Sequence, residues 1–402
     1  MEKEKNGRLI WLDGLKGIAC LGVFVHHFFL GFYPASYFGN VLESGLNGVD
    51  HMLSCEPVGF LINGNFWVNV FVLIAAFLPA RTIMRCREEE VKRRAGTMIL
   101  KRYPRLAIPV TAACIIYYVI MRILIANGAN YMDKELSYGP GQYMLHVLFT
   151  QYLQEDSTIQ GSYWTLHELF IGAYFAILIS LASGKKRTWM LAVYLFCFAA
   201  FRVAGVSFMA CALGVFLADM VTYGRCDAIK EKLVILKNKK AGMVISLLSV
   251  LLALFLGGYP SYVVPENIYR IVKPLAVLIS PIGVHAIAAY LLVGGIYMFH
   301  TYTDLSVLSA AVFRFLGRIC MGIYLFHLMW IELLGYWLKD RLAERMAGNT
   351  AAAVTFAVIA VGILVTAAGF NVLVEKPAEK LLGRFTPHQS PAATASPQGM
   401  KP

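Results

Sequence analysis

Charged residues are scarce in this 402-residue chain, and their scarcity excludes an ordinary soluble protein. Asp, Glu, Lys and Arg together make up 15% of the sequence, whereas hydrophobic residues make up 58%, and the mean hydropathy is +0.62. Soluble domains carry about 25% charged residues. The composition therefore predicts an integral membrane protein that crosses the bilayer several times.

Cysteine motifs that bind metals or exchange disulfides are also missing. The eight cysteines are scattered, with no Cys-x-x-Cys pair and no Cys/His ligand spacing, so neither a metal nor a redox dithiol is predicted. There is no internal repeat and no second soluble domain. We expect one membrane domain over residues 1–385 and a cytoplasmic tail, 386–402, whose Pro/Ser/Ala-rich composition predicts disorder.

What the chain does contain is a series of apolar runs, each close to the roughly 20 residues that span a bilayer as a helix. The fifth and sixth runs are separated only by a bend around Gly205 and Ser207. The sequence therefore predicts an all-α bundle of about ten transmembrane helices. Their expected positions are 14–33, 63–80, 106–126, 162–184, 188–205, 206–222, 241–258, 275–298, 319–338 and 350–374.

The formal net charge of +12 could indicate a nucleic-acid partner, but the basic residues have a different pattern. Most of the 36 Lys and Arg residues lie in alternate connections, with the densest group in 81–105 and none in 34–62. The positive-inside rule then places both termini and the basic connections in the cytoplasm. We therefore expect a multi-pass protein of the plasma (inner) membrane, in contact with lipids and without nucleic acid.

The first apolar run, "LDGLKGIACLGVFVHHFF", contains ionisable residues that a simple membrane span does not need. Lys16 and His27 are separated by eleven residues, which puts them about 20° apart around a helix and ~16 Å apart along it. His26 points about 80° away from Lys16. A structural alternative is that Lys16 extends to the lipid headgroups, Asp13 caps the helix, and the histidines bond neighbouring helices. Charged groups at membrane depth are usually functional, which favours a site at His27.

Two arginines stand one turn apart in "KRYPRLAIP", where the third span begins. Guanidinium groups bind phosphate oxygens with two hydrogen bonds, so Arg102 and Arg105 are candidates for holding a phosphorylated cytosolic ligand. Anchoring of the helix at the inner membrane border is the alternative explanation. The nine basic residues between Arg81 and Arg105 exceed what anchoring requires, which favours a binding function.

Taken in order along the chain, these segments resemble the acyltransferase-3 family of integral-membrane, acyl-CoA-dependent O-acyltransferases. The first run resembles the family's first helix, in which a basic residue is followed after ten residues by His, and "LKRYPRLAIP" resembles its Arg-x-x-Arg motif. Four further segments resemble later parts of the family. They are "FVLIAAFLPAR", "YWTLHELFIGAYF", "LGRICMGIYLFH" and "VEKPAEKLL".

The chain departs from the family's pattern at three places. Ala75 and Ala76 stand where the family usually has Ser-Gly, so a role for that serine cannot be transferred. Glu168 follows Trp164 by four residues instead of five, which changes its helix phase. Lys16 replaces a commoner arginine, which keeps the charge but loses the forked hydrogen-bonding geometry.

The resemblance implies transfer of an acyl group, usually acetyl and never aminoacyl, from cytosolic acyl-CoA to a hydroxyl of an envelope or exported carbohydrate, including a lipid-linked one. On that basis Lys16, Arg102 and Arg105 are expected to hold the phosphates of CoA. Direct transfer is favoured over an acyl-enzyme because no Ser or Cys has an evident nucleophile arrangement.

The same resemblance gives expectations for the catalytic residues. His27 would be the general base that deprotonates the acceptor hydroxyl. Glu168 would orient that imidazole or the sugar, and His327 or Tyr324 would stabilise the oxyanion.

Two other classes of protein remain compatible with the residues. In a transporter or flippase of a sugar-linked substrate, Lys16, His27 and Glu168 would line a substrate or proton pathway. Transporters usually show paired halves, and no internal duplication is visible here. A membrane scaffold is disfavoured by the number of ionisable groups within the spans.

Overall fold

The computed structural model describes residues 9–127, 139–155, 157, 159–204, 208–263, 268–303 and 306–384. Within these ranges the chain forms helices and no strand, which confirms the all-α prediction. The predicted tail, 386–402, and the predicted bend around residues 205–207 lie outside the described residues.

Eight helices in the described ranges are long and apolar enough to cross a membrane. The protein is therefore an all-α polytopic membrane protein. The eight are α1 (Ile10–Phe32), α4 (Gly64–Met84), α5 (Glu88–Ala126), α8 (Trp164–Ala182), α13 (Lys239–Gly257), α15 (Pro281–Tyr302), the continuous segment Ala311–Ala343 and the continuous segment Gly348–Arg384. The first continuous segment contains α16 (Ala311–Trp330), a π-helical turn (Ile331–Gly335) and α17 (Tyr336–Ala343); the second contains α18 (Gly348–Phe370), a π-helical turn (Asn371–Glu375) and α19 (Lys376–Arg384).

The fifth and sixth predicted spans differ from this group in length. They correspond to α9 (Met190–Ala204) and α10 (Phe208–Thr222), of 15 residues each. The α10 helix passes the span criterion only together with α11 (Arg225–Lys232), from which it is bent by 67°. In the described ranges the structure therefore contains eight or nine helices that meet the span criterion and one shorter apolar helix, α9.

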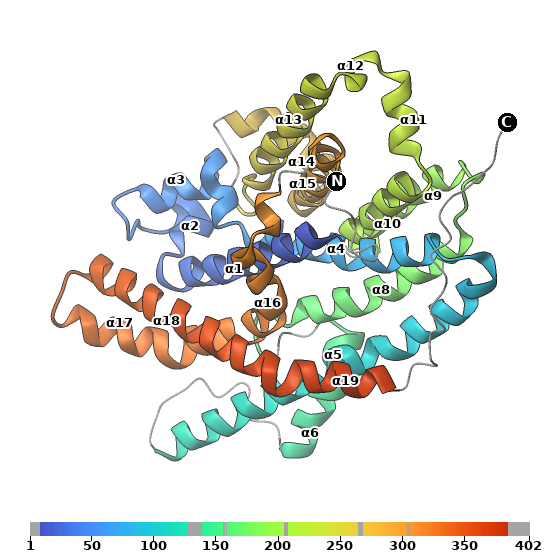
Figure 1. The fold of residues 1–402 in the computed structure, drawn as a ribbon. Coiled ribbons are helices and arrows are strands. Elements are labelled where there is room, and N and C mark those ends of the chain that lie inside the picture. The colour runs from blue at the N-terminus through green and yellow to red at the C-terminus, as the bar shows by residue number, and fades with distance from the viewer. Residues whose placement is uncertain are drawn as a thin grey trace.

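Short helices occupy the connections. They are α2 (Ala35–Phe38), α3 (Val49–Cys55), α6 (Pro140–Leu145), α7 (Gln151–Leu153), α12 (Val234–Lys237) and α14 (Lys273–Ile279), with 3-10 turns at Gly39–Val41, Pro57–Leu61, Ile268–Ile271 and Val307–Ser309 and a π-helical turn at His146–Thr150. The α2 and α3 helices follow the end of α1 (Figure 1).

Two helices begin earlier than the sequence predicts. The α5 helix starts at Glu88, so most of the basic connection is helical. Its first turn carries three glutamates, which stabilise a helix N-terminus. The α1 helix starts at Ile10, and Leu9 is the N-cap residue. The alternative role of Asp13 as the cap is therefore wrong, because Asp13 lies within the first turn and instead pairs with Lys16.

Glycines bring α1 and α16 into close contact. A Cβ atom on Gly317 would lie 2.0 Å from the backbone oxygen of Asp13, and one on Gly17 would lie 2.7 Å from the backbone nitrogen of Gly317. Small residues allow membrane helices to approach each other at backbone distance. The two helices run in parallel, since Gly17 meets Gly317 near their beginnings and His27 meets His327 near their ends.

The α4 helix packs against α1 in the opposite direction. Gly22 of α1 lies against the indole of Trp67, and His26 lies against Gly64 at the start of α4. The other side of α4 contacts α8 and α10, where Gly214 closely approaches the backbone of Leu73. These contacts make α1, α4, α8 and α16 neighbours around one interior region (Figure 1).

Candidate active site

Two histidines from distant parts of the sequence meet in this interior region. His27 Nδ1 lies 3.2 Å from His327 Nε2, and their ring centroids are 4.9 Å apart. His327 is fully buried, whereas His27 is partly exposed. The pair forms because the parallel packing of α1 and α16 carries both imidazoles to the same level.

The partners of the two rings define their protonation pattern. His27 Nδ1 lies 2.9 Å from the backbone oxygen of Val23, and His327 Nδ1 lies 2.7 Å from that of Tyr324. Carbonyl oxygens only accept hydrogen bonds, so both Nδ1 atoms carry hydrogen in the neutral pair. His327 Nε2 is then the second acceptor for His27 Nδ1–H. This leaves His27 Nε2 with a lone pair and no protein partner among the described residues, which is the arrangement of a general base.

His26 has a different environment from His27, as the helical rotation predicts. Its Nδ1 donates to the backbone oxygen of Ile62 at 2.9 Å, and its ring contacts the start of α4. The face shared with Lys16 therefore belongs to His27.

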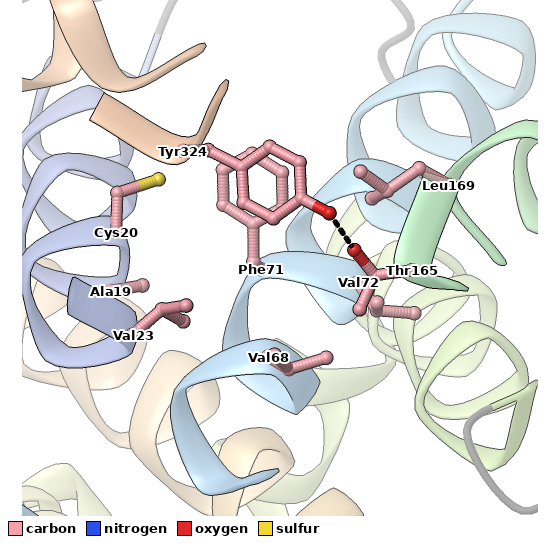
Figure 2. A pocket seen from close by; sticks show the side chains of 9 residues that line it. All are labelled: Ala19, Cys20, Val23, Val68, Phe71, Val72, Thr165, Leu169 and Tyr324. Atoms are coloured by element: carbon pink, nitrogen blue, oxygen red, sulfur yellow. Dashed lines mark hydrogen bonds between the residues drawn. The ribbon is translucent and has the colours of Figure 1, made fainter. Parts of the chain in front are cut away.

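A small apolar cavity lies one to two turns before His27 along α1. Figure 2 shows the side chains that line it. The cavity has a volume of about 10 Å³. It therefore holds about one water molecule, and a larger group requires the helices to separate. The lining residues come from α1, α4, α8 and α16 and are Ala19, Cys20, Val23, Val68, Phe71, Val72, Thr165, Leu169 and Tyr324.

Tyr324 forms one wall of this cavity and joins α16 to the start of α8. Its hydroxyl donates to the backbone oxygen of Ser162 and lies 2.5 Å from the hydroxyl of Thr165 (Figure 2). Because a tyrosine hydroxyl carries one hydrogen, that hydrogen is engaged by Ser162. In this arrangement neither Tyr324 nor His327 directs a free hydrogen toward the cavity for an oxyanion.

Glu168 is buried on α8, with 1% of its surface exposed. It lies three residues after Thr165 and one before Leu169, both of which line the cavity. The hydrogen-bond partners of His27 are Val23 and His327, so in this structure these two groups, and not Glu168, orient the imidazole.

The two predicted phosphate-binding arginines face different neighbours. The Arg102 guanidinium donates to the backbone oxygen of Leu169, whose side chain lines the cavity. The buried Nε atom of Arg102 has no hydrogen-bond partner among the described residues. Arg105 is 69% exposed and lies 3.5 Å from Glu379 on α19. Arg102 thus belongs to the interior region and Arg105 to the surface.

Lys16 stands on the other side of the cavity from the histidine pair. Its ammonium group lies 2.9 Å from the Asp13 carboxylate, and its side chain is 23% exposed. Ala19 and Cys20 follow one turn later and line the cavity. The predicted common face of α1 therefore presents, in order, a cation, an apolar cavity wall and the His27 imidazole.

Three residues of this region were not singled out from the sequence. Thr165 and Cys20 line the cavity, and Arg81 on α4 is buried with 9% of its surface exposed. All three lie inside the segments that resemble the acyltransferase-3 family, and this resemblance is the sequence feature that could have identified them. No group of three or more potential metal ligands occurs in the described ranges.

The helices and this site define a multi-pass membrane protein with an intramembrane histidine pair beside an apolar cavity. Residues 9–370 match the family model described as an acyltransferase domain. The chain therefore belongs to the acyltransferase-3 family and is a membrane acyltransferase. No curated protein and no solved structure matches it.

Proposed function

We propose that this acyltransferase moves an acyl group, with acetyl as the expected one, from cytosolic acyl-CoA to a hydroxyl of an envelope or exported carbohydrate, in the plasma (inner) membrane. The observation that carries the proposal is the His27 imidazole. Its Nδ1–H is held by Val23 and His327, which leaves the Nε2 lone pair without a protein partner among the described residues.

The reaction follows from this arrangement. His27 Nε2 removes the proton of the acceptor hydroxyl while the oxygen attacks the thioester carbonyl. The tetrahedral intermediate then collapses, the bond to sulfur breaks, and the imidazolium returns the proton to the CoA thiolate. His327 Nε2 accepts the hydrogen bond of His27 Nδ1–H, which strengthens when His27 becomes positively charged. His327 is thus a positioning and charge-stabilising residue.

The positions of the cations support a donor site at one end of this path. Arg102 and Lys16 flank the cavity and would hold the phosphates of CoA, and Arg105 would attract them at the surface. The acyl group would then lie in the apolar cavity with its carbonyl toward His27. Glu168 is not hydrogen-bonded to the His27 imidazole, and we expect it to orient the sugar.

The test uses the purified full chain in proteoliposomes with acetyl-labelled acetyl-CoA and envelope polysaccharide. The enzyme produces labelled polysaccharide and free CoA in equal amounts. A transporter moves label across the membrane without chemistry, and a scaffold does neither. His27→Ala should abolish transfer, whereas His146→Ala, a histidine substitution away from the cavity lining, should not. Both variants are first compared with the wild type by gel filtration and thermal melting. Full activity in a folded His27→Ala protein would refute the proposed base.

A further inference from the structure

An aromatic cluster lies beyond the end of α1, on the side of His27 opposite the cavity. It combines Tyr37 and Phe38 of α2 with Tyr262, which follows α13. The Tyr262 ring centroid is 5.0 Å from that of Tyr37 and 5.5 Å from that of Phe38. Tyr262 is 67% exposed, so a large part of its ring is available to a ligand.

Ring contacts connect this cluster to the proposed base. The Tyr37 centroid is 5.1 Å from that of His26, and the His26 centroid is 5.0 Å from that of His27. The cluster therefore begins two ring-to-ring steps from His27.

Hydrogen bonds fix the backbone under the cluster. Asn65 Nδ2 donates to the Tyr37 hydroxyl at 3.2 Å and to Ser261 Oγ at 2.8 Å. Asn63 Nδ2 donates to the backbone oxygen of Tyr259 at 2.9 Å. Three separate segments are thereby joined, so the surface is preorganised, which reduces the entropy lost when a ligand binds.

The segment that carries Tyr37 and Phe38 has an acidic composition, which bears on the choice of ligand. Residues 33–63 contain Glu43, Asp50 and Glu56 and no Lys or Arg. Burial alone would raise the pKa of the Asp50 carboxyl, but hydrogen bonds from Ser44 and from the backbone of Gly45 and His51 lower it below its ordinary value. The segment therefore stays negatively charged at neutral pH and disfavours anionic ligands.

We propose that Tyr37, Phe38 and Tyr262 form the acceptor subsite, and that it takes a neutral or amino-substituted sugar ring in preference to a phosphorylated one. The inference rests on the proposed function, because it assigns the acceptor to the side of His27 away from the cavity. Aromatic faces cover the apolar C–H face of a pyranose, while the Tyr37 hydroxyl and Asn65 offer polar atoms at its edge.

The experiment measures binding and transfer separately on the purified full chain. The probes are methyl β-D-glucopyranoside, glucosamine and glucose 1-phosphate. Saturation-transfer NMR reports binding, and labelled acetyl-CoA reports transfer. Tyr262→Ala should raise the KM for methyl glucoside about three- to tenfold and leave the KM for acetyl-CoA unchanged. Tyr262→Phe, which retains the ring, should recover most of the affinity. Trp337→Ala, which removes an aromatic residue that is 57% exposed on α17, is the matched control.

The outcomes separate this inference from the proposed function. Acetyl transfer with an unchanged acceptor KM in Tyr262→Ala would overturn the subsite alone. Equal or stronger binding of glucose 1-phosphate would overturn its charge preference. Sugar binding that depends on Tyr262, without transfer from acetyl-CoA to any acceptor, would leave Tyr262 as a sugar-binding residue. It would overturn the enzymatic proposal together with the acceptor assignment that rests on it.

Discussion

Substitution of His327 by alanine tests whether the two imidazoles act as one unit. His27 Nδ1–H has two acceptors, Val23 at 2.9 Å and His327 at 3.2 Å. The variant keeps the first, so the tautomer of His27 is preserved and only the second hydrogen bond is lost. That bond matters most when His27 is cationic in the transition state. A hydrogen bond to a charged group contributes about 1.5–3 kcal/mol, which corresponds to a loss of about 10- to 150-fold in kcat.

The matching variant is His27→Ala, which removes the base itself and should cost about 10²- to 10⁴-fold. Because His327 acts through His27, the double variant should be no slower than His27→Ala. The assay is the transfer of labelled acetyl to polysaccharide by proteoliposomes, with the KM for acetyl-CoA measured alongside. If the two losses multiply in the double variant, or if His327→Ala is the slower single variant, the assignment of His27 as base and His327 as its support is refuted.

Three further predictions, each with a control variant, concern the donor side, the cavity and the helix packing. Arg102→Ala should raise the KM for acetyl-CoA by at least tenfold because the guanidinium is an interior cation, whereas the exposed Arg105→Ala should change it less than threefold; equal effects would contradict the separation of the two arginines. Cys20→Phe should fill the cavity and abolish transfer while equilibrium dialysis still detects CoA binding, and Cys20→Ser should remain active; an active phenylalanine variant would exclude the cavity as the acyl site. Gly317→Ala should lower stability by about 1–3 kcal/mol, measured by thermal unfolding in detergent, because its methyl group has no room against α1. Gly369→Ala, which meets nothing within 4 Å, is its control, and equal melting of the two proteins would contradict the close packing of α1 and α16.

Hydropathy predicted the helical segments well, because a run of about 20 apolar residues can satisfy its backbone hydrogen bonds in lipid only as a helix. It was less accurate at the ends of helices. The α5 helix extends back to Glu88 because a polar, basic sequence can continue a helix outside the apolar region.

The relative positions of site residues on the same helix could be predicted from the sequence. The contacts between site residues on different helices could not. The common face of Lys16 and His27 follows from residue spacing, and the structure places the cavity between them. The contact of His27 with His327 depends on close packing at Gly17 and Gly317, for which the sequence contains no distance information. Arg102 and Arg105 are one turn apart, yet their neighbours, α8 and α19, lie in different directions from α5.

The parallel contact between α1 and α16 also has a consequence for biosynthesis. The two imidazoles are 300 residues apart in the chain, so a ribosome that adds about 5–20 residues per second completes the second one about 15–60 s after the first. Throughout that interval the proposed base, His27, lacks the hydrogen-bond acceptor that we expect to stabilise its charged form. We therefore expect acyl transfer to reach its full rate only after α16 has been inserted.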